Sequence, residues 1–114
     1  MNECIFCKIV QGEIPSKKIY EDDKVIAFHD INPEAPVHVL IIPKQHIESA
    51  NELNEENSYL VAHIFMVIKK LAKEHGIDKE GYRIVNNCGE YGGQTVPHLH
   101  FHLFGGKSFG WPPL

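Results

Sequence analysis

The chain has 114 residues, of which 43% are hydrophobic and 23% charged, a composition typical of one small globular domain. Eleven basic against fifteen acidic residues leave a net charge of −4, and no run of lysine or arginine marks a nucleic-acid-binding surface, so we expect no nucleic-acid partner. No apolar run approaches the ~20 residues of a membrane-spanning helix, and the first residues do not resemble a signal peptide. We therefore expect a cytoplasmic protein with no membrane partner.

The N-terminal segment carries a Cys-x-x-Cys pair, Cys4 and Cys7, in a short helix predicted over residues 4–12. In a cytosolic chain such a pair indicates metal or redox chemistry before a structural disulfide. A thioredoxin-like pair would follow a strand, and nothing strand-like precedes Cys4, so zinc is the better interpretation. Two cysteines are only half of a zinc site, and two further ligands must lie elsewhere in the chain.

Residues 17–20 and 24–29 are predicted as two strands of a hairpin, because the turn-forming run Glu-Asp-Asp joins them. The second strand leads through Asp30 into an irregular loop over residues 32–36, which contains two prolines. A carboxylate at the mouth of this loop suits the two hydroxyl groups of a ribose. It suits the capping of the loop equally well, and the residues alone do not decide.

A third strand is expected over residues 38–42, and its mostly apolar sequence favours a central place in the sheet. His46, in the turn that follows, is a candidate for a further zinc ligand. The one long helix is predicted over residues 54–75, with Asn54 as its N-cap and Gly76 as its stop. Its apolar stripe is broad enough to cover a sheet and to leave area for a second copy of the chain.

A fourth strand is expected over residues 81–87, followed by a loop over residues 88–95 with three glycines. Glycines let backbone amides approach an oxyanion closely, and Gln94 and Thr95 add side-chain donors. The loop is therefore predicted to bind phosphate, although it has neither the Gly-Lys-Ser/Thr run nor the following helix of a Walker loop. Beyond it, Trp111 in the C-terminal tail is expected to pack on another surface, such as a partner subunit.

The most distinctive stretch is the strand predicted over residues 98–104, where His98, His100 and His102 alternate with apolar residues. Alternate side chains of a strand point to the same face, so the three imidazoles share one face with roughly 6.6 Å between neighbours. That spacing suits one reacting phosphorus, because one ring attacks it while the next meets the leaving atom. Histidines in this pattern also converge on zinc, and the pattern alone does not separate the two interpretations.

The run at residues 98–104 matches the signature His-φ-His-φ-His-φ-φ, and the chain resembles the histidine triad superfamily of nucleotide hydrolases and transferases, in particular its Hint branch of nucleoside phosphoramidate hydrolases. The resemblance extends over nearly the whole chain, through Ile5, Phe6, residues 28–31, His38, Asn86, residues 93–95 and residues 111–113. Five predicted strands and one long helix indicate a single α+β domain, residues 1–114, with an antiparallel sheet and the helix on one face. The resemblance adds a homodimer in which two such sheets join into one.

The resemblance also implies a role for each matching residue. His100 would be the nucleophile, attacking the α-phosphate of an adenosine or guanosine 5′-phosphoramidate to form a nucleotidyl-imidazole that water hydrolyses. A neutral ring can attack when its other N–H is held, for instance by a backbone carbonyl. His102 would protonate the leaving amine or stabilise phosphate charge, and His38 would hydrogen-bond beside the nucleophile. Besides His100 and His102, the implied nucleotide-binding residues are Ile5, Phe6, Ile9, Phe28, His29 and Ile31 around the purine, Asp30 at the ribose, Asn86, Gln94 and Thr95 at the phosphate, and Trp111 from the second copy.

The Cys4 and Cys7 pair departs from animal Hint proteins and resembles bacterial members that bind zinc. By that analogy His46 and His98 complete a closed Cys₂His₂ structural site, so His98 would not act on substrate. No organic cofactor is expected. Two other functions stay open: a dinucleoside polyphosphate hydrolase of the same superfamily, against which the Trp-Pro-Pro tail argues, and a non-enzymatic, zinc-stabilised nucleotide-binding module.

Overall fold

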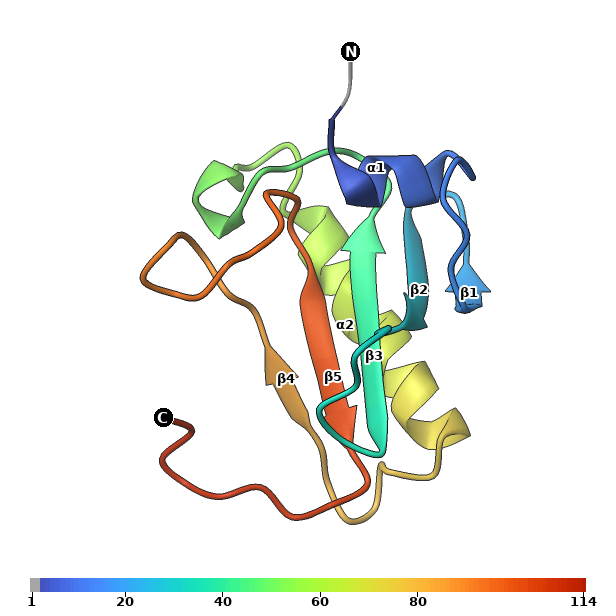
Figure 1. Ribbon diagram of the computed structural model, residues 1–114, viewed down its shortest axis with the longest axis vertical. Helices are drawn as coiled ribbons and strands as arrows, with labels where there is room; N and C mark the ends of the chain where they lie inside the picture. The colour runs from blue at the N-terminus through green and yellow to red at the C-terminus, as the bar shows by residue number, and fades with distance from the viewer. Residues whose placement is uncertain (1–2) are drawn as a thin grey trace.

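Across residues 3–114, which the computed structural model describes, five strands form one antiparallel sheet in the order β1-β2-β3-β5-β4 (Figure 1). The elements in chain order are α1 (Ile5–Val10), β1 (Lys18–Glu21), β2 (Val25–His29), β3 (Val37–Pro43), the 3₁₀ turn η1 (Ala50–Glu52), α2 (Tyr59–Glu74), β4 (Arg83–Val85) and β5 (Phe101–Gly105). The predicted α+β class is confirmed. The apolar strand β3 lies in the centre of the sheet, as its sequence predicts.

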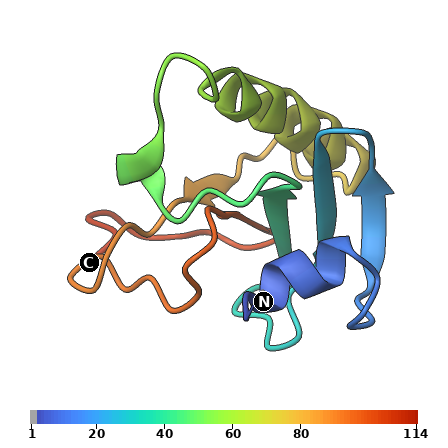
Figure 2. The same cartoon turned by 90° about the horizontal axis from the view of Figure 1, so that it is seen from above.

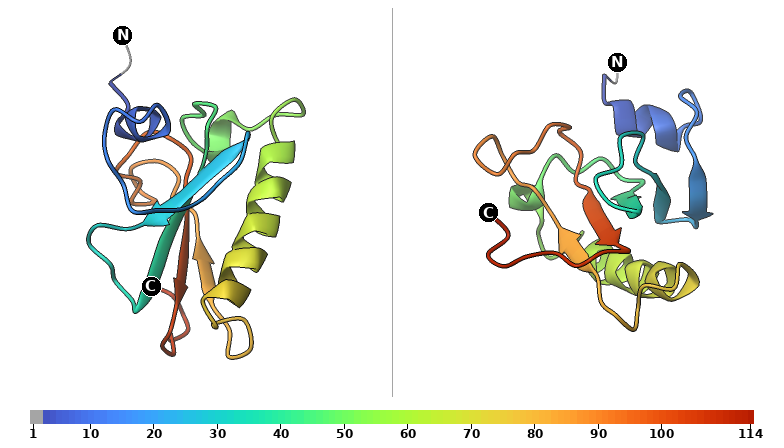
Figure 3. Two further views of the ribbon diagram at one scale, coloured as in Figure 1. Left: turned by 90° about the vertical axis from the view of Figure 1, so that its right-hand side faces the viewer. Right: turned by 60° about the horizontal axis from the view of Figure 1, so that its bottom comes forward.

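The two faces of the sheet are covered by different helices, α2 on one side and α1 on the other (Figures 2 and 3). Because side chains alternate along a strand, β2 sends Val25 and Ala27 toward α2 and sends Ile26 and Phe28 toward α1. The main core lies under α2, and its side chains contribute about 1.5–3 kcal/mol each when they are large and fully buried. The smaller apolar cluster lies under α1, on the face of the sheet that carries the candidate site.

The long helix starts later than its sequence predicts. The side chain of Asn54 accepts hydrogen bonds from the amides of Glu56 (2.8 Å) and Asn57 (3.0 Å), so it caps a separate turn, and α2 begins only at Tyr59. The predicted start at residue 54 is therefore wrong by five residues. The predicted stop is confirmed, because Gly76 has a φ of +70°, in the left-handed region that favours glycine.

The histidine strand is also shorter than predicted, because β5 begins at Phe101 and residues 98–100 lie outside the ladder. The amide of Leu99 donates instead to the carbonyl of Ile47, at 2.6 Å. The alternation nevertheless holds, since Leu99, Phe101 and Leu103 all pack in the core under α2. Among residues 3–114, no helix is long and apolar enough to cross a membrane.

Candidate active site

His100 lies buried on the face of the sheet that α1 covers, 4% exposed. Its Nδ1 is 2.7 Å from the carbonyl oxygen of His98. A carbonyl oxygen only accepts hydrogen bonds, so we assign the proton to Nδ1 and the lone pair to Nε2. Burial lowers the pKa of His100 below the ordinary value, which keeps the ring neutral at pH 7. Asn86 donates its side-chain amide to the carbonyl of His100 itself, at 2.9 Å, and so fixes the backbone of this residue.

His102 is oriented by a chain of hydrogen bonds that begins in the loop before β3. The amide of Glu34 donates to Nδ1 of His38 (3.1 Å), so neutral His38 carries its proton on Nε2. That nitrogen lies 2.9 Å from Nδ1 of His102, which must accept. The proton of neutral His102 is therefore on Nε2. Burial, helped by His100 and His38, lowers the pKa of His102 to about 4.

The two rings together present complementary groups to a substrate. The ring centroids of His100 and His102 are 5.2 Å apart, with a lone pair assigned to Nε2 of the first and an N–H to Nε2 of the second. A nucleophile beside a hydrogen-bond donor is the arrangement that displacement at phosphorus requires. The structure therefore brings together the three residues His38, His100 and His102 that the sequence singled out for catalysis.

The aromatic rings of Phe6, Phe28 and Phe104 form an apolar wall beside these histidines. The ring of Phe6, from α1, meets His100 edge-on at 5.1 Å and Phe28 at 5.8 Å. The ring of Phe104 stacks on His102 with an interplanar angle of 2°. Aromatic side chains in this position limit the mobility of the rings and keep water from one side of them.

The remaining residues expected around the purine are spread over this region. Ile9 packs against the cluster under α1, whereas Ile5 is 46% exposed and Ile31 90% exposed. The side chain of His29 is not brought to this wall. It follows Phe28 in β2 and so points to the opposite face, where its ring centroid is 5.9 Å from that of His75.

The glycine-containing loop after β4 is held in shape by Gln94. Its Oε1 accepts from the amide of Gly89 (2.9 Å), and its Nε2 donates to the carbonyls of Glu48 (2.8 Å) and Val96 (3.0 Å). The side chain that the sequence suggested as a phosphate donor is thus engaged within the loop. Thr95, beside it, is exposed.

Asp30 sits between the loop and the histidines. Its Oδ1 accepts from the amide of Asn32 (2.8 Å), which caps the loop, and its Oδ2 lies 3.5 Å from Nε2 of His38. The capping role is therefore observed, and the ribose-binding role, which the sequence left as the alternative, stays a prediction. Trp111 is 85% exposed in the C-terminal tail.

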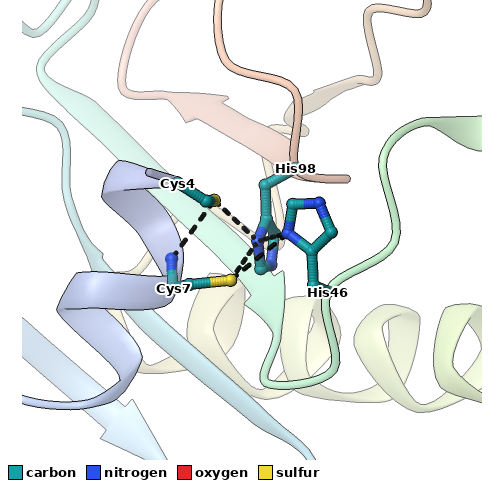
Figure 4. Close-up of side chains that lie close together, drawn as sticks. All are labelled: Cys4, Cys7, His46 and His98. Carbon is teal, nitrogen blue, oxygen red and sulfur yellow. Dashed lines mark hydrogen bonds between the residues drawn. The ribbon is translucent and has the colours of Figure 1, made fainter. Parts of the chain in front are cut away.

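The second group of functional side chains is formed by Cys4, Cys7, His46 and His98 (Figure 4). Nδ1 of His98 lies 3.3 Å from Sγ of Cys4, 3.5 Å from Sγ of Cys7 and 3.2 Å from Nδ1 of His46. Zinc bonds of 2.0–2.3 Å in a tetrahedron separate the ligand atoms by about 3.3–3.8 Å. The four side chains come from α1, the loop after β3 and the segment before β5, so distant parts of the chain meet here.

The hydrogen bonds of His98 support metal binding by this cluster. Its Nε2 lies 2.9 Å from the carbonyl oxygen of Pro43, so the proton is on Nε2 and the lone pair of Nδ1 points at the cysteines. Burial lowers the pKa of His98 to about 4, which favours the neutral ring that a metal requires. Two thiols and two imidazoles are the donor set of structural zinc sites, so these residues fit that metal.

Within the described residues, Asp30, His38 and His102 are a second group whose donor atoms lie within 4.8 Å of one another. Here the hydrogen bonds argue against a metal. The amide of Glu34 needs the lone pair of His38 Nδ1, so Nε2 carries the proton and has no lone pair to offer. The structure thus divides the three histidines of the pattern: His98 lies in a cluster that could hold a metal, and His100 and His102 lie outside that cluster.

The chain is similar to known proteins over most of its length. A family model described as "Scavenger mRNA decapping enzyme C-term binding" matches residues 3–110. The purine nucleoside phosphoramidase of Escherichia coli (strain K12) is 44% identical to this chain, over 95% of this chain and 91% of that protein. An uncharacterized HIT-like protein of Buchnera aphidicola is 50% identical over 91% of each. The solved structure of a HIT family hydrolase from Clostridium thermocellum superposes with a TM-score of 0.97 at 51% identity, covering 100% of this chain and 99% of that one.

Proposed function

The chain belongs to the histidine triad (HIT) family of hydrolases, and on that premise we propose that it hydrolyses purine nucleoside 5′-phosphoramidates, releasing AMP or GMP and an amine. The observation that carries the proposal is the lone pair assigned to His100 Nε2 beside the N–H of His102. The phosphoramidase of Escherichia coli, which resembles the chain over most of its length, supports the choice of a P–N bond.

In the first step Nε2 of His100 attacks the α-phosphorus, and the P–N bond to the amine breaks. The new nucleotidyl-imidazole is a cation, and the carbonyl of His98 stabilises it by accepting the hydrogen bond from Nδ1. The leaving nitrogen needs a proton. It takes this proton from a water molecule, which becomes hydroxide, while the Nε2–H of neutral His102 donates a hydrogen bond to a phosphoryl oxygen and stabilises the charge that develops there.

In the second step a water molecule attacks the phosphorus from the side that the amine has left. The hydroxide left by the first step takes a proton from this water, and the bond between phosphorus and His100 breaks. His100 returns to its starting form, and the nucleoside monophosphate leaves. His38 keeps His102 turned toward the phosphorus throughout, through the 2.9 Å bond to Nδ1.

The nucleotide is proposed to lie along the face of the sheet under α1. Its purine would contact Phe6 and Phe28 with neighbouring Ile5, Ile9 and Ile31, its ribose would lie at Asp30 and its phosphate at His100 and the loop that ends in Thr95. His29 would contribute through its main chain, since its ring points to the other face. Gln94 and Asn86 would act by holding the loop and the backbone of His100 in place.

We further propose a homodimer with a continuous sheet. β4 is an edge strand, and α2 exposes Phe65 (43%) and Met66 (61%) on its surface. Phe65 contacts Phe101 of β5, so this apolar patch lies on the side of the sheet that ends in β4. A second copy would cover both features and bring its Trp111 toward the neighbouring site.

Zinc is the metal proposed for the cluster of Cys4, Cys7, His46 and His98. When bound it would close a tetrahedral structural site that ties α1 to the segment before β5. Cysteine ligands must be reduced, which supports a cytoplasmic location for the protein.

The test is a pre-steady-state reaction with a fluorogenic adenosine 5′-phosphoramidate in excess over the sites, in which the first turnover is resolved. The wild type should release one equivalent of amine per site in a burst that precedes the appearance of AMP, and His100→Ala should release none while still binding AMP. Retained turnover in His100→Ala would exclude the proposed nucleophile. A dinucleoside polyphosphate assayed in parallel identifies the substrate class, because faster cleavage of that compound would contradict the proposed phosphoramidase activity.

A further inference from the structure

His98 takes part in both groups of functional residues. Its imidazole is one of the four donors of the cysteine and histidine cluster, and its carbonyl accepts the hydrogen bond from Nδ1 of His100 at 2.7 Å. We propose that His98 is a positioning residue for His100, so that closure of the Cys4, Cys7, His46 and His98 cluster sets the rate of nucleophilic attack. The inference rests on the proposed function for its kinetic part and on geometry alone for its structural part.

The carbonyl of His98 follows the position of its side chain closely. The residue is fully buried, and both ring nitrogens are engaged, Nε2 with the carbonyl of Pro43 and Nδ1 with the donors of the cluster. Its own amide donates to the carbonyl of Val96 at 2.8 Å. Since these bonds leave the residue little room to move, a change in how the cluster holds the ring changes where the carbonyl points.

The cluster is also linked to His100 by the ring of Phe6, which contacts both His98 and His100. This residue lies between Cys4 and Cys7 in α1, and its ring is 5.9 Å from that of His98 and 5.1 Å from that of His100. α1 has six residues, too few for a helix to be stable on its own, so its place depends on what anchors it. The two cysteines at its start are part of that anchor.

The consequence for chemistry lies in the tautomer of His100. Attack through Nε2 requires the proton on Nδ1, and the carbonyl of His98 is what holds it there. When the cluster opens, part of the protein carries the proton on Nε2 and has no lone pair for attack. The rate of the chemical step therefore falls even when substrate is saturating. Under that condition, weaker purine binding caused by a displaced α1 does not affect the measured rate constant.

His46 offers a clean way to open the cluster, because it comes from an exposed loop and reaches the cluster from outside. His46→Ala leaves three donors, whereas His46→Cys restores four in a Cys₃His set that zinc also accepts. With zinc added, we expect the single-turnover rate constant at saturating substrate to drop about tenfold in His46→Ala, as is typical when the support of a functional group is lost, and to recover within about threefold in His46→Cys.

The second readout is independent of activity. In the zinc-loaded wild type, the Nδ1 proton of His100 should give a slowly exchanging NMR signal with the ¹⁵N shifts of that tautomer. The signal should broaden or vanish in His46→Ala and return in His46→Cys. The matched control is His63→Ala, which removes a 2.6 Å hydrogen bond to Asp22 elsewhere in the fold. It should lower stability without changing the rate constant or the signal.

An unchanged rate constant and an unchanged signal in folded His46→Ala would overturn the inference and leave the cluster a purely structural role. If His46→Ala does not fold, His46→Gln, which retains a polar side chain, is measured in the same way and decides by the same criteria. Should the wild type show no burst, the proposed function fails, while the NMR signal still decides whether the cluster positions His100.

Discussion

The hydrogen bond from His38 to His102 gives the sharpest test of the proposed chemistry. His38 is 4% exposed, accepts from the amide of Glu34 and donates to Nδ1 of His102 at 2.9 Å. In His38→Leu nothing donates to Nδ1, so His102 is free to carry its proton on the wrong nitrogen. Loss of one preorganised hydrogen-bond donor to the charge of a transition state costs about 10²–10³ in rate. At 1.36 kcal/mol per tenfold change, the variant should lose about 2.7–4 kcal/mol of transition-state stabilisation.

The matched variant is His38→Gln, whose side-chain amide still donates to His102 and whose oxygen can still accept. It should lose no more than about tenfold relative to the wild type, because the tautomer of His102 is retained. The assay is single-turnover release of amine at saturating phosphoramidate, with thermal unfolding of each variant measured alongside, since loss of the partner of Glu34 costs about 1–3 kcal/mol of stability. Equal rate constants for His38→Leu and His38→Gln in folded protein would refute the tautomer argument.

Three further predictions concern stability. His63→Ala should lower the free energy of unfolding by about 1.5–3 kcal/mol in urea denaturation, since it removes a hydrogen bond to a carboxylate, and an unchanged midpoint would contradict this. Acid should destabilise the fold: His102 has a pKa of about 4 when folded and about 6.5 when unfolded, so the unfolded chain binds the proton first and the free energy of unfolding falls from pH 6.5 to pH 4. Urea denaturation in this pH range should show that the free energy of unfolding falls less steeply with pH in His102→Gln than in the wild type. Identical slopes for the two proteins would exclude His102 as a source of the pH dependence. Chelation of zinc should lower the melting temperature of the wild type by more than that of Cys7→Ser, and equal shifts would argue against a metal at this cluster.

The sequence predicted the faces of the elements well and their ends less well. Alternation over residues 98–104 identified which side chains share a face, because it depends only on local backbone geometry. The starts of α2 and β5 depend on partners distant in sequence or on competing local turns. Asn54 is a good N-cap by residue type, and it does cap, but it caps a separate turn over residues 55–58, and α2 begins only after that turn, at Tyr59.

The pair formed by Asp22 and His63 shows what local patterns do not reveal. Asp22 is typical of a turn, and His63 has the pattern of a surface residue on the helix. In the structure Nε2 of His63 lies 2.6 Å from Oδ2 of Asp22, and this pair links the β1-β2 hairpin to α2. Burial works against the charge of Asp22. Hydrogen bonds from His63, from the amides of Lys24 and Val25, and from Tyr20 outweigh it and hold the pKa of the carboxyl well below its usual range. Only the packing of α2 across the sheet brings these residues together.

The three alternating histidines are equivalent in the sequence and differ in the structure, and the difference arises at the second nitrogen of each ring. The carbonyl of Pro43 turns the lone pair of His98 toward the cysteines, and the carbonyl of His98 leaves the lone pair of His100 free for attack. His38, with its N–H, makes His102 a donor. None of these partners is a side chain of the pattern: two lie on β3, and the third is the main-chain carbonyl of His98, just before β5. The pattern therefore predicts that imidazoles gather on one face, whereas long-range contacts decide which of them joins the cysteine cluster, which presents a lone pair and which presents an N–H.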